Sequence, residues 1–226
     1  MKNVIEKEDR TRLIITEGID YLTTGDKSIW GEGDRDTLDV IKDYKFKGKW
    51  INLAAGDGRY NNGILEQVDS LIATDVDQSA LAKLEKTTPL ELRNKLTTER
   101  VNLTENLPYN NGEFDGVFCV GTLHLFPEKE LKKMFSEINR VVKKGGHIFI
   151  DFATNINRLL PDGTQYKILD EVSYRTEEAE NIFRENFSNF DLEITRHKVP
   201  EEIVKIDQLS YVFSCNYILV RGTKIS

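Results

Sequence analysis

The sequence is poor in the residues that build disulfide frameworks and metal centres. It contains only two cysteines, Cys119 and Cys215, and both lie in apolar runs, the usual setting of a buried free thiol in a reducing compartment. Its three histidines, His124, His147 and His197, are far apart and lack the spacing of zinc ligands. We therefore expect neither a disulfide nor a metal site.

Long apolar runs and an excess of basic residues are missing too. No run is long enough to span a bilayer, and residues 1–12, MKNVIEKEDRTR, lack the apolar core of a secretion signal. We therefore expect a cytoplasmic protein with no membrane partner. The formal net charge of -7 works against nonspecific binding to nucleic acid, although it leaves a local basic groove open. With 39% hydrophobic and 31% charged residues, the chain has the composition of one globular domain.

What the sequence does contain is a segment typical of a strand, a glycine turn and a helix, WINLAAGDGRYNNGI, at 50–64. Small residues occupy four of the five positions 54–58: Ala54, Ala55, Gly56 and Gly58. Side chains this small let backbone amides approach a ligand closely. The segment therefore predicts a turn over which a small-molecule cofactor binds.

Apolar patterning along the rest of the chain alternates between strand and helix. We expect the first strand to begin at Trp50, with later strands at 71–77, 100–103, 113–120 and 147–153 and helices at 62–68, 127–144 and 176–187. Further helices are expected within 1–24 and at 35–45. The last two strands, 190–199 and 209–222, have no helix between them and should pair antiparallel. This order predicts a doubly wound, mostly parallel α/β sheet that ends in an antiparallel hairpin.

In such a sheet the ligand binds at the carboxyl ends of the strands. Asp75 ends the second strand, 19 residues after Gly56, an interval at which a carboxylate can accept hydrogen bonds from both hydroxyls of a ribose. A dinucleotide would place its pyrophosphate at the glycine turn, where Asp57 adds a negative charge and Asn61 replaces the third small residue. S-adenosylmethionine carries a sulfonium and an ammonium instead, so it suits an acidic turn better.

Four blocks in the correct order resemble the class I S-adenosylmethionine-dependent methyltransferases over residues 48–153. INLAAGDG is similar to the family's glycine-rich first motif, and ATDVDQSAL to its second, which carries the ribose acid. NLPYNNGEFDGVFCVGTLHLF resembles the block around the fourth strand, and EINRVVKKGGHIFI the helix that ends in a Gly-Gly stop. The resemblance implies a Rossmann-like, seven-stranded α/β fold with extra N-terminal helices, in one domain. Residues 1–47 would form those helices and a possible lid, 48–153 the cofactor-binding core, and 154–226 the acceptor-side loop, a helix and the hairpin.

The resemblance also implies which residues contact S-adenosylmethionine. Asn52 stands where the family usually has an acid, Ala54 where it has a glycine, and Leu103 where an Asp often contacts adenine, so we expect a different arrangement at these three positions. The full set of expected cofactor contacts is Asn52, Ala54, Ala55, Gly56, Asp57, Gly58, Asp75, Val76, Leu103, Thr104, Cys119 and Val120.

The expected reaction is an in-line methyl transfer to an acceptor, which the sequence does not identify and which we expect to be a small molecule. If a base is needed, His124 after the fourth strand is the candidate, with shaping of the pocket wall as its alternative role. The stretch 155–174 would face the acceptor, and Tyr21 and Trp30 would form either a lid or an aromatic anchor. A nucleotide-dependent oxidoreductase and a noncatalytic methyltransferase-like scaffold remain as alternatives, and the oligomeric state is open.

Overall fold

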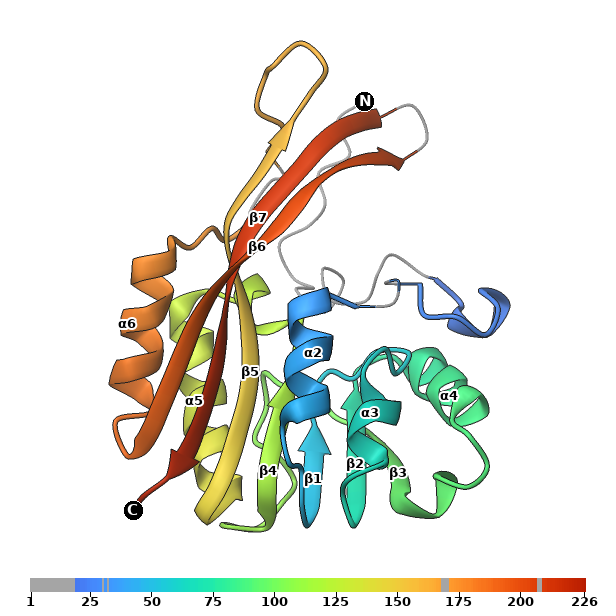
Figure 1. Cartoon of the computed structure of the whole chain (residues 1–226), viewed down its shortest axis with the longest axis vertical. Helices are drawn as coiled ribbons and strands as arrows, with labels where there is room; N and C mark the ends of the chain where they lie inside the picture. The colour runs from blue at the N-terminus through green and yellow to red at the C-terminus, as the bar shows by residue number, and fades with distance from the viewer. Residues whose placement is uncertain (1–18, 30, 32, 168–170, 207–208) are drawn as a thin grey trace.

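The computed structural model describes residues 19–226 except 30, 32, 168–170 and 207–208. Its core is one seven-stranded sheet with the order β3-β2-β1-β4-β5-β7-β6 (Figure 1). The strands are β1 Lys49–Asn52, β2 Ser70–Asp75, β3 Leu96–Arg100, β4 Phe114–Cys119, β5 Val142–Leu159, β6 Phe190–Ile206 and β7 Leu209–Lys224. The helices are α2 Arg35–Asp43, α3 Asn61–Leu65, α4 Gln78–Thr87, α5 Glu128–Val141 and α6 Thr176–Asn186, with 3-10 turns η1 Tyr21–Thr23, η2 Arg93–Lys95 and η3 Leu123–Leu125. No helix in these described ranges is long and apolar enough to cross a membrane.

The sheet confirms the α/β topology expected from the sequence. Strand β1 pairs in parallel with β2 on one side and β4 on the other, and β7 pairs antiparallel with both β5 and β6. The chain therefore changes direction across the sheet between β1 and β4, and this point is where open α/β sheets bind their ligands.

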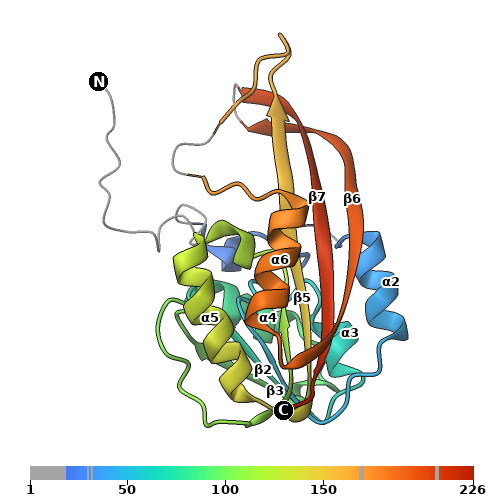
Figure 2. The same cartoon turned by 90° about the vertical axis from the view of Figure 1, so that its left-hand side faces the viewer.

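Two apolar layers cover the sheet, α2 and α3 on one face and α5 and α6 on the other (Figure 2). Neighbouring residues of one strand serve opposite layers: Val117 of β4 packs in the α5 and α6 layer, whereas Phe118 packs in the α2 and α3 layer. Helix α5 is amphipathic and buries Leu131, Phe135 and Ile138. Both faces of the central strands are thus shielded from water, so ligands reach the sheet at the strand ends.

The third strand lies earlier than expected. We predicted a strand at 100–103, but β3 ends at Arg100, which pairs with Asp75 at the end of β2. The reason is that β3 is an edge strand whose residues are all partly or fully exposed, so LTTER shows no apolar alternation. Residues 101–103 consequently lie just beyond the strand ends.

The expected irregular stretch 155–174 begins with strand as well. Strand β5 continues to Leu159, and together with β6 and β7 it projects beyond the body of the molecule (Figures 1 and 2). The pairing of β5 with β7 is interrupted by a register shift between Thr154 and Asn157, where Asn155 has a φ of 50°. It then continues to Leu159, which pairs with Val212. This bulge explains why the sequence pattern breaks at 155 although the strand goes on. The helix expected within 1–24 falls largely outside the described residues, and 19–24 contain only the turn η1.

Candidate functional site

The turn after β1 is held by backbone hydrogen bonds to both neighbouring strands. The Leu53 N–H donates to the Phe118 carbonyl at 2.8 Å, and the Ala55 N–H donates to the Thr74 carbonyl at 2.7 Å. Ala54 has a φ of 52°, a left-handed conformation that disfavours any side chain. At Gly58 a Cβ would lie 2.9 Å from the Leu84 side chain, so only glycine fits there without a shift. The geometry of this turn therefore requires glycine at position 58 and strains the backbone of Ala54.

The carboxylate of Asp75 links this turn to the end of β2. Its Oδ2 accepts a hydrogen bond from the Gly56 N–H at 2.8 Å, and its Oδ1 accepts one from the Asp77 N–H at 2.9 Å. Burial raises the pKa of Asp75, and the two backbone donors work against this rise. Each oxygen keeps a lone pair for a further donor, so the group can still accept hydrogen bonds from ligand hydroxyls.

A pocket opens beside Asp75 at the ends of β2, β3 and β4. Its open space is ≈ 310 Å³ including the solvent-filled mouth. Four of the expected cofactor contacts line it: Ala54, Asp75, Val76 and Leu103. Four further lining residues lie outside the set of expected cofactor contacts: Val101, Asn102, Thr122 and Phe126. Val101 and Asn102 fell within the strand predicted at 100–103. If LTTER had been recognised as an exposed edge strand, these two residues would have been placed after the strand.

The other expected contacts do not line this pocket. Asn52 is buried below the turn, where its amide donates to Asn61 Oδ1, and the Cys119 thiol is fully buried, which raises its pKa. Thr104 is exposed outside the pocket. The other expected cofactor contacts that do not line the pocket are Ala55, Gly56, Asp57, Gly58 and Val120. Among them, Gly56 contacts Asp75 through its backbone N–H.

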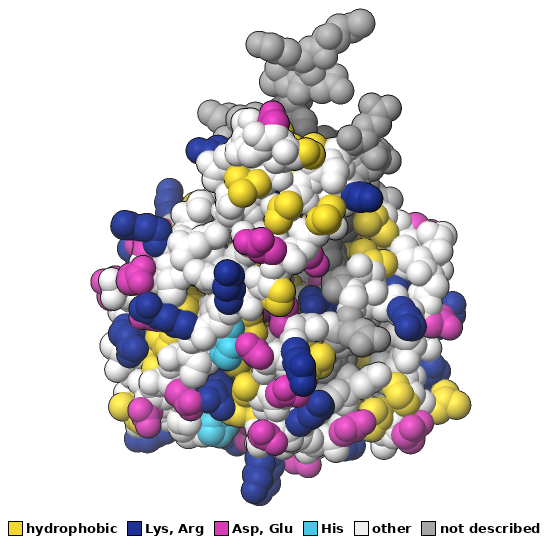
Figure 3. Space-filling model, turned by 45° about the horizontal axis from the view of Figure 1, so that its top comes forward, with side chains coloured by type: hydrophobic (Ala, Val, Ile, Leu, Met, Phe, Trp, Pro, Cys, Tyr) yellow, Lys and Arg dark blue, Asp and Glu magenta, His cyan; other side chains and the backbone are white. Residues whose placement is uncertain are grey.

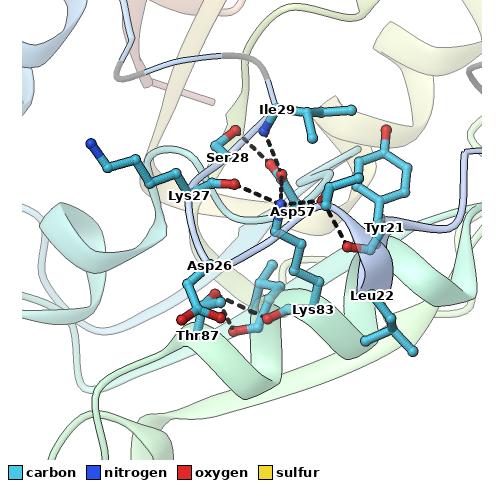
Figure 4. A network of polar contacts seen from close by, with 12 residues as sticks. Tyr21, Leu22, Asp26, Lys27, Ser28, Ile29, Asp57, Lys83 and Thr87 are labelled. Carbon is cyan, nitrogen blue, oxygen red and sulfur yellow. Dashed lines mark hydrogen bonds and ion pairs between the residues drawn. The ribbon is translucent and has the colours of Figure 1, made fainter.

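Asp57 holds the N-terminal segment rather than facing the pocket (Figure 4). Its carboxylate accepts hydrogen bonds from Ser28 Oγ at 2.6 Å and from the Ile29 N–H at 2.9 Å, and forms an ion pair with Lys83 Nζ at 2.9 Å. The Lys83 ammonium also donates to Thr24 Oγ1 at 2.8 Å and to the Lys27 carbonyl at 2.7 Å. The negative charge of Asp57 is therefore paired with Lys83 within the protein, so the Asp57 carboxylate is not free to repel an anion bound at the turn.

Tyr21, one of the two expected lid or anchor aromatics, is buried, and its backbone N–H donates to Ser79 Oγ of α4 at 3.2 Å. Trp30 lies outside the described residues. The segment 20–29 is thus attached to α4 and to the turn after β1, and Ala54 of that turn lines the pocket.

His124, the expected base, lies in η3 with its ring edge against Phe152, 6.2 Å between centroids. Its Nδ1 is buried and has no hydrogen-bond partner in the described part of the chain. Burial, with a smaller effect of Arg158, lowers the pKa of His124 to about 4. The ring is therefore uncharged at neutral pH and is a weak proton acceptor there.

The surface at this end of the molecule mixes basic and acidic side chains. Figure 3 shows Lys and Arg interspersed with Asp and Glu on the face that contains the top of Figure 1. A surface of this kind has no broad positive field of the type that phosphate backbones require.

Comparisons with known proteins agree with this arrangement. A family model described as a methyltransferase domain matches residues 51–146. The glycine/sarcosine N-methyltransferase of Parasynechococcus marenigrum is 27% identical over 122 residues, which make up 50% of this chain and 40% of that protein. The chain thus matches less than half the length of this curated relative.

Two solved structures show the same fold. The YcgJ protein of Bacillus subtilis is similar with a TM-score of 0.65 and 14% identity over 85% of this chain and 100% of that one. The DhpI–SAH complex is similar with a TM-score of 0.54 and 16% identity over 79% of this chain and 81% of that one.

Proposed function

We propose that the chain is a class I S-adenosylmethionine-dependent methyltransferase that binds S-adenosylmethionine in the Asp75 pocket and transfers the methyl group to a small molecule. The observation that carries the proposal is the hydrogen bond from the Gly56 N–H to Asp75 Oδ2. It fixes a ribose-binding carboxylate next to a glycine turn, at the edge where an α/β sheet binds its ligand.

The residues of the pocket fit the cofactor. Val76, Val101, Leu103 and Phe126 provide apolar contacts for a flat adenine ring, and Asp75 provides the acceptors for the ribose hydroxyls. Donors from those hydroxyls would also compensate the buried charge of Asp75. The cofactor itself supplies an activated methyl group on a positively charged sulfur.

The protein's own contribution to the reaction is position and exclusion of water. Ala54 and Thr122 approach the pocket from the turn after β1 and from the segment after β4, between which the methionine end of the cofactor would lie. An acceptor held in line with the methyl group gains most of its rate from orientation in a dry site. His124 would act in this scheme as part of the pocket wall, because its lowered pKa makes it a poor base at neutral pH.

The oxidoreductase alternative is less well supported. A pyrophosphate needs free backbone amides at the turn, but Gly56 N–H donates to Asp75 and the Gly58 N–H donates to the Ala55 carbonyl. A scaffold without catalysis would share the fold and the pocket, so turnover is what distinguishes it.

Two measurements test the proposal. Calorimetric titration with S-adenosylhomocysteine should give saturable binding at one site, and titration with NAD should give none. Incubation with S-adenosylmethionine and a panel of small amines, phenols, thiols and carboxylates should then release S-adenosylhomocysteine with at least one acceptor. Binding of NAD without binding of S-adenosylhomocysteine would support the oxidoreductase instead, and binding without turnover would support the scaffold.

A further inference from the structure

A buried carboxylate lies on the opposite side of β4 from the cofactor pocket. Asp151 of β5 is only 7% exposed, and its Oδ1 accepts a hydrogen bond from the Gly121 N–H at 2.6 Å. Gly121 follows the carboxyl end of β4 and immediately precedes Thr122, which lines the pocket. The carboxylate of Asp151 is thus placed at the same edge of the sheet as the proposed cofactor site.

The end of β4 lies between two acidic groups. The charges of Asp151 and Asp75 both raise the pKa of the Cys119 thiol, so both carboxylates are within electrostatic reach of this last residue of β4. In the sheet β2 lies beyond β1 on one side of β4, and β5 lies on the other. A molecule over the end of β4 would therefore have Asp75 on its cofactor side and Asp151 on its far side.

Structural duties do not account for Asp151. Among the described residues its Oδ2 receives no hydrogen bond, and this oxygen is not one of the fully enclosed atoms, so it can accept a hydrogen bond from a ligand. Burial raises the pKa of Asp151 to about 7, with Asp34 adding to the rise and Arg59 opposing it. The titratable and charged groups that face Asp151 are Asp34, Arg59, Tyr60, Cys119, Cys215 and Tyr217.

A second polar group at this place also lacks a partner. The Nε of Arg59 is buried and makes no hydrogen bond within the described residues, while Nη2 of the same side chain lies 3.8 Å from Asp34 Oδ2. Arg59 belongs to the turn after β1 that also forms the cofactor pocket. The region therefore offers a carboxylate that can accept and a guanidinium that can donate.

We propose that Asp151 is the acceptor-binding residue and that the acceptor is a small amine, an inference that rests on the proposed methyl transfer. The amine binds in its unprotonated form, and the Asp151 carboxylate accepts a hydrogen bond from its N–H; once the C–N bond has formed, the carboxylate takes one proton from the resulting ammonium. The nitrogen lone pair forms the new C–N bond to the methyl carbon, the C–S bond breaks, and its electron pair stays on sulfur, which becomes neutral. The proton leaves Asp151 for solvent when the products dissociate.

Charge distinguishes amines from other acceptors here. A phenol or thiol attacks as an anion, which Asp34 and Asp151 would both repel. The unprotonated form of an amine is neutral and gains positive charge as the C–N bond forms, and a carboxylate stabilises that developing charge. The site thus favours nitrogen over oxygen or sulfur as the attacking atom.

The test compares Asp151→Asn with the wild-type chain on one panel of ethylamine, glycine and sarcosine, with catechol and 2-mercaptoethanol as non-amine probes. Asparagine keeps an oxygen for the Gly121 N–H but cannot take a proton at neutral pH. We expect at least one amine to be methylated, and kcat/KM for it to fall about 100-fold in Asp151→Asn, the usual contribution of a proton acceptor. We also expect the pH profile of kcat/KM in the wild type to contain a rise centred at about 7 that is absent from Asp151→Asn, in which only the rise due to deprotonation of the free amine remains.

Controls separate this inference from the function on which it rests. Asp191→Asn, on the exposed side of β6, makes the same chemical change and should leave kcat/KM unchanged. The Kd for S-adenosylhomocysteine should stay within about twofold of wild type in both variants, which also shows that they are folded. Loss of that binding in the wild type itself refutes the proposed function. Intact binding with inert amines, or with full amine turnover in Asp151→Asn, overturns the role of Asp151.

Discussion

The ammonium of Lys83 lies 2.9 Å from the carboxylate of Asp57, and the two side chains are 2% and 0% exposed. Lys83 comes from α4 and Asp57 from the turn after β1, and between them they bind the backbone or side chains of Thr24, Lys27, Ser28 and Ile29. A buried charge pair is costly to break because the remaining charge has no water around it. This pair therefore attaches the N-terminal segment to the turn after β1.

We expect Asp57→Asn to lower the free energy of unfolding by about 3 kcal/mol, since it leaves the Lys83 ammonium buried without a counter-charge. Urea denaturation measures the loss, and hydrogen exchange should show faster exchange of the amide of Ile29. Lys86→Met on the same helix is the control: its ion pair with Asp26 is exposed and 3.8 Å long, so its removal should change the stability by less than about 1 kcal/mol. Equal losses in both variants would contradict a special role for the buried pair.

Asp75→Asn should weaken binding of S-adenosylhomocysteine by about 10-fold to 100-fold. An asparagine amide has one accepting oxygen, so either Gly56 N–H or Asp77 N–H would meet an NH₂ group and the ribose would lose an acceptor. Calorimetry gives the Kd. Asp77→Asn is the matched control, because Asp77 accepts from the Ser79 and Ala80 N–H groups as the cap of α4, a position where asparagine serves equally well. An unchanged Kd in Asp75→Asn would remove Asp75 from the cofactor site.

Ala54→Gly should stabilise the protein by about 0.5 kcal/mol, because relief of the left-handed φ of 52° outweighs the extra chain entropy of glycine. Ala55→Gly, next to it and without a positive φ, should have the opposite sign and destabilise by a similar amount. Urea denaturation midpoints compare the two. A destabilised Ala54→Gly would show that the methyl group of Ala54 makes a packing contact worth more than the strain.

Stability should depend on pH through Asp151. Its pKa is raised to about 7 by burial, so between the ordinary value of 3.8 and about 7 the folded protein binds more protons than the unfolded one. The free energy of unfolding then falls as pH rises through this window. Asp151→Asn should be more stable than wild type by about 1 kcal/mol or more at pH 8 and equal to it near pH 4. Denaturation at both pH values measures this, and a difference independent of pH would contradict a raised pKa.

The titration of His124 should change the free energy of unfolding with pH in the opposite direction. Its pKa is lowered to about 4, so between that value and 6.5 the unfolded protein binds more protons and stability rises with pH. His147, whose pKa burial also lowers, contributes in the same direction. Titration followed by NMR should show the His124 ring neutral at pH 5.5, and His124→Gln should flatten the acid limb of the stability curve while turnover stays within about threefold of wild type. Loss of the neutral-pH turnover instead would restore His124 as the base.

Much of this fold was predictable because its signals are local. The β4 segment EFDGVFCV and the α5 segment show strong apolar patterns, and the glycine turn and Asp75 show a fixed interval. The β3 segment was misplaced since an exposed edge strand carries no apolar alternation, and the misplacement hid Val101 and Asn102 from the pocket.

Long-range partnerships were beyond the sequence. Nothing in the residues around Lys83 indicates that it pairs with Asp57, and the expectation that Asp57 contacts the cofactor came from its place in the glycine turn. The burial of His124 and Asp151 likewise depends on elements distant in the chain, so their shifted pKa values follow only from the folded packing.

The position of β7 has a consequence for the order in which the sheet can form. Strand β6 is made before β7 during synthesis, yet it joins the sheet only through β7, which lies between it and β5. A nascent chain that has emerged as far as Ile206 therefore has β5 and β6 complete but no ladder between them. The facing edges of β5 and β6 can be covered only after the ribosome has released Leu209–Lys224. Until that late step these edges are exposed to chaperones or to misassociation.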